Sequence, residues 1–172
     1  MEVIMKKITF GGNEVTLKGS QIKVGDEGID FTAVNKDLSP YKFFENTENK
    51  VKVISVAPSL DTSVCAFQAE EFNKKIEDLK DDVALVTITV DLPFAQKRFC
   101  SSHDTENGVV VSDYKDLDFG KKYGFVIDEF RLLARGVIII DEDNTVKYVE
   151  FVPEVTDHID YDKAMKAVKD LV

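Results

Sequence analysis

The two cysteines are the side chains of this chain that most clearly could take part in a reaction. Cys65 closes the stretch "PSLDTSVC", in which Pro58 and Thr62 precede it, and Cys100 closes the later stretch "PFAQKRFC". A thiolate is a strong nucleophile, whereas an ordinary cysteine, with a pKa of about 8.5, is only a few per cent ionised near neutral pH. A nucleophilic role for Cys65 therefore requires surroundings that stabilise the thiolate.

The elements on either side of "PSLDTSVC" predict such surroundings. The near-continuous apolar run "VKVISVA" at 51–57 is typical of a strand that is covered on both faces. A helix is predicted to begin near Thr62, which would place Cys65 in its first turn. Unpaired backbone N–H groups and the positive end of the helix dipole favour an anion there. The local sequence therefore favours a thiolate at Cys65.

Efficient catalysis would also need fixed donors that stabilise charge on a substrate in the transition state. Thr62 offers a hydroxyl one helical turn before Cys65. The guanidinium candidates are Arg98, Arg131 and Arg135. Two plainer interpretations stay open at this point: Asp61 or Thr62 serves only as a helix N-cap, and Cys65 is only a small buried apolar residue.

Other cysteine chemistries are not favoured by the residue types present. His103 and His158 are too few and too scattered to complete a zinc centre with two cysteines. The chain has no Cys-x-x-Cys motif, which argues against a thioredoxin-type disulfide reductase. Two cysteines are also too few for a disulfide framework, and in a reducing cytosol a bridge is transient or catalytic.

A β-α-β unit is predicted around Cys65. The helix is predicted over 63–79 from an apolar stripe at helical spacing, formed by Val64, Phe67, Phe72, Ile76 and Leu79. The run "DVALVTITV" at 82–90 supplies a second buried strand. The crossover between the two strands is expected to be right-handed.

The remaining elements extend this unit into a mixed sheet. Short runs around "GGN" predict an N-terminal β-hairpin within residues 1–18. Further strands are predicted at 30–35, 109–112, 136–141 and 145–152, with an apolar approach to the core at 41–45, and further helices are predicted at 92–102, 117–124 and 160–172. This order of elements matches an α/β, thioredoxin-like fold with a mixed central sheet flanked by helices. One domain is expected over 1–172.

Composition and charge exclude several functions. Apolar residues make up 44% and charged residues 31%, an ordinary globular balance. The formal net charge of -10 disfavours nucleic acid and anionic membranes as partners. No apolar run approaches the ~20 residues that span a bilayer, and the start has no secretory signal. We therefore expect a cytoplasmic protein whose native start is Met1 or Met5.

Several stretches of the chain resemble one known family. Pro58, Thr62 and Cys65 fit the Pro-x-x-x-Thr-x-x-Cys signature of the peroxiredoxins. The chain resembles their atypical two-cysteine branch, the thiol peroxidases, in "PSLDTSVCAFQAEEFNK", "DLPFAQKRFC", "LLARGVIIIDEDNTV" and "VPEVT". A lone signature would be weak, but these stretches occur in the expected order and extend over nearly the whole chain.

The resemblance implies roles for five residues. Cys65 matches the peroxidatic cysteine, which attacks a peroxide oxygen and becomes a sulfenic acid. Thr62 matches the threonine whose hydroxyl contacts thiolate and peroxide, and Pro58 matches the proline that shields the pocket. Arg135 matches the arginine that stabilises the thiolate and polarises the O–O bond. Cys100 matches the resolving cysteine, which would form an intramolecular disulfide with Cys65.

Partners are also implied by the resemblance. We expect a hydrogen peroxide or organic hydroperoxide substrate, thioredoxin as the reductant, and no metal or organic cofactor. A homodimer packed near the active site is expected, and its edges would suit Phe67, Phe94 and Phe99, although each of these could equally be an ordinary core residue. The segment "DHIDYDKAM" replaces a proline-containing stretch of the branch, so the shape of this pocket-side loop is expected to differ.

Cys65 and Cys100 are predicted on separate helices. A disulfide requires Cα atoms within about 7 Å, so one helix must partly unwind if the reduced fold holds them further apart. Two other functions are compatible with the same residues. One is a peroxide sensor or redox relay that passes its disulfide to a client protein, and the other is a non-catalytic thioredoxin-like binding module with an inert Cys65.

Overall fold

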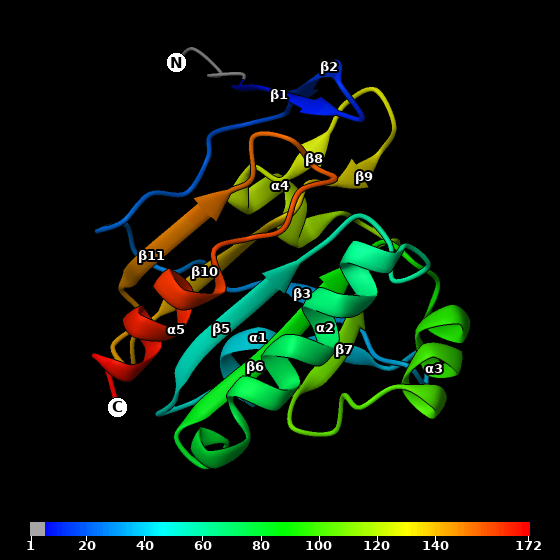
Figure 1. Cartoon of the computed structure of the whole chain (residues 1–172). Helices are drawn as coiled ribbons and strands as arrows, with labels where there is room; N and C mark the ends of the chain where they lie inside the picture. Colours follow the sequence, from blue (N-terminus) through cyan, green and yellow to red (C-terminus); the bar gives the residue numbers. More distant parts are fainter. Residues whose placement is uncertain (1–5) are drawn as a thin grey trace.

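The computed structural model describes residues 6–172 as two β-sheets with flanking helices (Figure 1). The strands are β1 Lys6–Phe10, β2 Asn13–Leu17, β3 Thr32–Val34, β4 Pro40–Lys42, β5 Val51–Val56, β6 Val83–Thr89, β7 Val109–Ser112, β8 Val126–Ile127, β9 Leu132–Leu133, β10 Gly136–Ile140 and β11 Val146–Phe151. The helices are α1 Phe43–Asn46, α2 Ser63–Lys75, the 3-10 turn η1 Glu77–Leu79, α3 Pro93–Ser102, α4 Asp118–Tyr123 and α5 Tyr161–Lys169.

The central sheet confirms the predicted mixed architecture. Its strand order is β11-β10-β5-β6-β7-β3-β4. Strands β5, β6 and β7 run parallel, whereas β10 lies antiparallel against β5 on the other side. All six residues of β5 are buried, which explains its continuous apolar sequence. Because β5 leads into α2 and β6 leads into α3, the helices that carry the two cysteines both start at the same edge of the sheet.

Helices cover both faces of the central sheet, as Figure 1 shows with α2 and α5 in front. Alternate residues of β5 point to opposite layers. Val53 packs with Phe72 of α2 and Val168 of α5, whereas Ile54 packs with Phe119 of α4. Two apolar layers therefore hold β5 fixed between them, and with it the loop that follows its last residue.

The predicted N-terminal hairpin is present as β1 and β2, and the residues of the predicted segment before Lys6 lie outside the described part. It belongs to a second sheet in the order β1-β2-β8-β9. Strands β8 and β9 were not predicted, because two-residue strands are too short to show an alternating pattern. The helix α4 ends as predicted at Gly124, whose φ of +80° suits glycine.

The predicted helix 63–79 and its apolar stripe need correction. Helix α2 stops at Lys75 and continues only as the short turn η1. Phe67, expected on the buried stripe, is 47% exposed, whereas Cys65 and Gln68 are buried. The inward face near the start of α2 carries polar residues, so hydropathy alone placed that face wrongly. No helix within residues 6–172 is long and apolar enough to cross a membrane.

A buried carboxyl group makes the stability of the fold depend on pH. Asp113 is 2% exposed and accepts hydrogen bonds from Phe119 N at 3.1 Å and Gly120 N at 2.8 Å. Burial nevertheless raises the pKa of Asp113 from 3.8 to about 6. Between these values the folded chain keeps a proton that the unfolded chain has lost. The contribution of Asp113 to the free energy of unfolding therefore falls as pH rises from about 4 to 6.

The difference between the two pKa values corresponds to about 3 kcal/mol of the free energy of unfolding. This amount is lost as the pH rises through that window, and no more is lost above it. We expect Asp113→Asn to remove this part of the pH dependence, since asparagine carries no titratable proton. Urea unfolding of both proteins at a series of pH values measures the effect. Parallel curves of stability against pH for the two proteins would contradict the prediction.

Candidate active site

The loop between β5 and α2 sets Cys65 in the first turn of the helix, as predicted. Thr62 has extended backbone geometry, and its Oγ1 accepts a hydrogen bond from Cys65 N at 3.4 Å. The Thr62 hydroxyl donates to Ser59 O at 3.2 Å. Thr62 is therefore the N-cap, and it fixes the backbone of Cys65 at the positive end of the helix dipole.

Arg135 is the arginine that meets Cys65. It lies in the turn between β9 and β10, and its Nη2 donates to Cys65 Sγ at 3.1 Å. Cys65 is 0% exposed and Arg135 is 2% exposed. Arg98 and Arg131 are both exposed, and Arg131 donates to Tyr114 O on the surface. Of the three arginines considered from sequence, Arg135 is thus the one bonded to the sulfur.

The partners of the buried guanidinium favour a charged sulfur. Arg135 Nη1 donates to Gln68 Oε1 at 2.9 Å, and Nε donates to Val155 O at 2.7 Å. Both acceptors are neutral, and no ion pair joins Arg135 to a carboxylate within residues 6–172. A buried cation requires a compensating charge. Of its three acceptors only Sγ can carry a negative charge, which it gains when the thiol loses its proton.

Gln68 orients this cluster and was not predicted from sequence. Its Nε2 donates to Ser55 Oγ at 2.8 Å and to Val56 O at 3.1 Å. These contacts turn Oε1 toward Arg135, where it accepts a hydrogen bond. The available signal was its position three residues after Cys65, since residues at that spacing share one face of a helix.

Asp91 anchors the loop that precedes Cys65 and was also missed. Its Oδ1 accepts from Ser59 Oγ at 2.6 Å, and its Oδ2 accepts from Leu60 N at 2.7 Å and Thr89 Oγ1 at 2.7 Å. Pro58, at the start of the same loop, is buried. A carboxylate just beyond β6 therefore ties the cysteine loop to the neighbouring strand. The sequence signal was a polar residue at the carboxyl end of a parallel strand.

Cys100 lies apart from this cluster on α3. It is half-buried and packs against an apolar group that includes Leu60, Ala69 and Phe99, and both cysteines are free thiols. The site thus brings Thr62, Cys65 and Arg135 together, with Pro58 buried at the base of the loop, and keeps Cys100 on a separate helix.

Comparison with known proteins decides the family. Residues 23–167 match the family model described as Redoxin. A thiol peroxidase of Halalkalibacterium halodurans is 48% identical over 165 residues, which cover 96% of this chain and 98% of the relative. A thiol peroxidase of Listeria monocytogenes is 45% identical over 165 residues, which cover 96% and 99%.

The chain belongs to the thiol peroxidase family.

Solved structures agree with this assignment. A peroxiredoxin-like protein from Aquifex aeolicus superposes with a TM-score of 0.89 at 38% identity, over 98% of this chain and 99% of that one. A thiol peroxidase from Chromobacterium violaceum gives 0.84 over 95% of each chain, and at 23% identity it supports the fold alone. As a thiol peroxidase family member, the protein is a peroxiredoxin-type enzyme with a thioredoxin-like fold.

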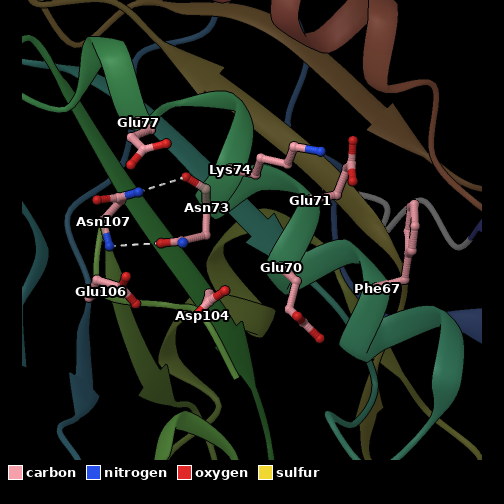
Figure 2. Close-up of a pocket in the computed structure, with 9 residues that line it drawn as sticks. All are labelled: Phe67, Glu70, Glu71, Asn73, Lys74, Glu77, Asp104, Glu106 and Asn107. Atoms are coloured by element: carbon pink, nitrogen blue, oxygen red, sulfur yellow. Dashed lines mark hydrogen bonds between the residues drawn. The ribbon is translucent and has the colours of Figure 1, made fainter. Parts of the chain in front are cut away.

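An acidic groove runs along the outer side of α2 in this thiol peroxidase family member (Figure 2). It is lined by Phe67, Glu70, Glu71, Asn73, Lys74, Glu77, Asp104, Glu106 and Asn107. Figure 2 shows two hydrogen bonds that cross it: Asn107 N donates to Asn73 Oδ1 at 2.7 Å, and Asn107 Nδ2 donates to Asn73 O at 3.0 Å. The segment that follows α3 is therefore fastened to α2 at Asn107.

An apolar pocket of about 460 Å³ opens beside the start of α2. Its lining includes Val64, Phe67, His158 and Tyr161. The Tyr161 ring packs edge-on against Phe67 and Phe72, and its hydroxyl is buried without a hydrogen-bond partner in residues 6–172. Burial raises the pKa of Tyr161, so the phenol stays protonated. The segment "DHIDYDKAM" thus supplies His158 and Tyr161 to the lining of this pocket.

The neutrality of Gln68 gives a direct test of the charge argument. In Gln68→Glu a carboxylate would compensate the Arg135 guanidinium and repel a thiolate at Cys65. We expect the rate of Cys65 alkylation by iodoacetamide near neutral pH to fall about tenfold, which corresponds to about 1.4 kcal/mol. The control is Glu70→Gln, a change to an outer residue of the same helix. An unchanged alkylation rate in Gln68→Glu would contradict thiolate stabilisation by Arg135.

Proposed function

We propose that the enzyme reduces hydrogen peroxide and organic hydroperoxides, with Cys65 as the peroxidatic cysteine. The observation that carries the proposal is the contact of 3.1 Å between Arg135 Nη2 and the buried Cys65 Sγ. The thiolate attacks one peroxide oxygen, an S–O bond forms, and the O–O bond breaks. Sulfur is thereby oxidised to a sulfenic acid, and the other oxygen takes a proton and leaves as water or an alcohol.

Arg135, Thr62 and Pro58 support this step. Negative charge moves from sulfur to the leaving oxygen, and a guanidinium fixed beside the sulfur stabilises both ends of that movement. The Thr62 hydroxyl, which donates to Ser59 O in the resting site, can turn toward the peroxide oxygen. Pro58 is buried under the loop and limits the access of water to the sulfur.

Cys100 is proposed to resolve the sulfenic acid. Its thiolate attacks Cys65 Sγ, an S–S bond forms, and the sulfenic oxygen leaves as water after taking a proton. The two thiols are free and lie on separate helices in the reduced fold, and we expect α3 to unwind partly for this attack. The hydrogen bonds from Asn107 to Asn73 fasten the chain beyond α3, so we expect the unwinding to stay within α3 and residues 103–106.

A dithiol protein of the thioredoxin type is proposed to restore both thiols by disulfide exchange. Intact and peptide mass spectrometry after one equivalent of hydrogen peroxide tests the whole sequence. We expect wild-type protein to lose two hydrogen atoms and give one Cys65–Cys100 peptide. Thioredoxin with its reductase and NADPH should then return it to the dithiol. Unmodified thiols after several minutes, or peroxide that leaves NADPH unconsumed in the coupled system, would refute the proposal.

A homodimer that packs beside the active site is also proposed. Phe67 is 47% exposed and Phe94 is 66% exposed, and Phe67 lines the apolar pocket at the start of α2. Large exposed aromatic residues are characteristic of interfaces. Phe99, the third aromatic residue considered for this role, is 9% exposed and stacks on His103, so it belongs to the core.

The proposed dimer gives a measurable expectation. Sedimentation equilibrium should show a dimer for the wild type and a shift toward monomer for Phe67→Glu, because a charge would be buried at the interface. The matched control is Phe130→Glu, since Phe130 is 58% exposed at a place distant in sequence from α2. A monomeric wild-type protein, or a Phe67→Glu variant that dimerises as tightly as the wild type, would contradict this interface.

A further inference from the structure

The loop 152–156, between β11 and α5, forms two hydrogen bonds with Arg135. Val152 N donates to Arg135 O at 3.0 Å, and Arg135 Nε donates to Val155 O at 2.7 Å. The position of the guanidinium therefore depends on the backbone of this loop. No regular ladder continues through it, because β11 ends at Phe151 and α5 begins at Tyr161. The conformation of the loop 152–156 must therefore be fixed by contacts with another part of the chain.

Those contacts come from the N-terminal hairpin. Thr9 of β1 pairs in parallel with Glu154 of the loop. Thr9 N donates to Pro153 O at 2.8 Å, and Val155 N donates to Thr9 O at 2.8 Å. The peptide unit next to the Arg135 acceptor is thus held by β1, although the two segments lie at opposite ends of the sequence.

The Glu154 carboxylate joins hairpin and loop more firmly. From the hairpin it accepts hydrogen bonds from Thr9 Oγ1 at 3.0 Å, Gly11 N at 3.1 Å and Gly12 N at 2.7 Å. From its own loop it accepts from Thr156 N and Thr156 Oγ1, both at 2.8 Å. Gly11 and Gly12 have positive φ angles, and their two amides converge on the carboxylate, as in an anion-binding nest.

Backbone and hydroxyl donors of this kind stabilise the ionised form. The pKa of Glu154 is lowered to about 2, and the hydrogen bonds from Thr156 N and Gly12 N make the largest contributions to this shift. The carboxylate is therefore charged at every pH at which the enzyme would work, and its hydrogen bonds are charge-assisted.

We propose that Glu154 is a positioning residue for Arg135, and that the β1–β2 hairpin acts through it as part of the active-site scaffold. Glu154 fixes the loop, the loop presents Val155 O, and this carbonyl holds Arg135 Nε so that Nη2 faces Cys65 Sγ. Small displacements of a charge-stabilising group reduce rates strongly, because the stabilisation depends on geometry fixed before reaction. The proposal rests on the role of Arg135 proposed above.

The test compares two carboxylates that hold the same hairpin. In Glu154→Gln an amide N–H₂ faces backbone donors, so the link to the loop weakens. The matched control is Glu129→Gln, because Glu129 accepts from Thr16 N at 2.8 Å and Thr16 Oγ1 at 3.1 Å but has no hydrogen bond to the loop. Stopped-flow oxidation by hydrogen peroxide should be about tenfold slower in Glu154→Gln and unchanged in Glu129→Gln.

A second readout separates positioning from general loss of structure. The ultraviolet absorbance of the Cys65 thiolate, followed against pH in a Cys100→Ser background, should shift to higher pH in Glu154→Gln and stay in place in Glu129→Gln. Thr9→Val removes one hairpin hydroxyl donor to Glu154 and should show a smaller loss of oxidation rate and a smaller shift of the titration. This variant replaces Glu154→Gln in the test if Glu154→Gln fails to fold.

Two results would overturn the proposal. One is an unchanged peroxide rate and thiolate titration in a folded Glu154→Gln or Thr9→Val protein. The other is an equal loss in Glu129→Gln, which would show that any loosening of the hairpin acts alike. An Arg135→Met variant measured alongside distinguishes the proposed role of Arg135 from that of Glu154. If Arg135→Met also reacts at the wild-type rate, Arg135 does not stabilise the reaction. If Arg135→Met is slow and Glu154→Gln is not, only the positioning role of Glu154 is refuted.

Discussion

Replacement of Arg135 by methionine is expected to slow the reaction of Cys65 with hydrogen peroxide by about 10²- to 10³-fold, or roughly 3 to 4 kcal/mol. Methionine is similar in length and apolar, so it can fill the buried volume without the charge. It removes the donor that lies 3.1 Å from Sγ and leaves the thiolate buried with no cation beside it. Stopped-flow kinetics of the first oxidation measures this directly.

The control for this prediction is Arg131→Met, since the Arg131 side chain is exposed. It should react at the wild-type rate. Circular dichroism and thermal unfolding establish that Arg135→Met is folded, and Arg135→Lys provides a second variant with the charge but without the planar fork. A folded Arg135→Met protein that reacts as fast as the wild type would show that the contact has no catalytic role.

Loss of the second thiol is expected to separate oxidation from turnover. In Cys100→Ser the first oxidation of Cys65 should proceed at the wild-type rate, because Cys100 lies outside the cluster around the sulfur. Turnover coupled to thioredoxin should fall by about a hundredfold or more, because an intramolecular thiol at high effective concentration is replaced by a dilute external one. A coupled NADPH assay measures turnover, and dimedone labelling detects the trapped sulfenic acid.

Two further variants complete that experiment. Cys65→Ser should show neither oxidation nor turnover, which separates the two thiols by role. Asn107→Ala, which removes the Nδ2 contact with Asn73 O, should leave the first oxidation unchanged and speed disulfide formation. If Cys100→Ser turns over with thioredoxin as fast as the wild type, the sulfenic acid is reduced directly and Cys100 is not the resolving residue.

Local sequence predicted the elements that have long, regular patterns. The buried run of β5, the parallel strand β6 and the start of a helix near Thr62 each arise from neighbours within a few residues, and all three are confirmed. The strands β8 and β9 were missed because pairing across the chain, and not local pattern, stabilises two residues. The apolar stripe of α2 was misplaced because its inward face holds Cys65 and Gln68.

For the site, the sequence by itself determined which residues could react and that Cys65 would lie at the start of a helix. The family resemblance already singled out Arg135, but only the tertiary structure decided how its guanidinium meets the sulfur, and that Gln68, Asp91 and Val155 hold the cluster in place. Arg135 follows Cys65 by 70 positions, and a contact at that separation depends on how β10 pairs with β5. Local sequence patterns do not encode such pairing, because the register and packing of distant strands are fixed only when the complete sheet forms.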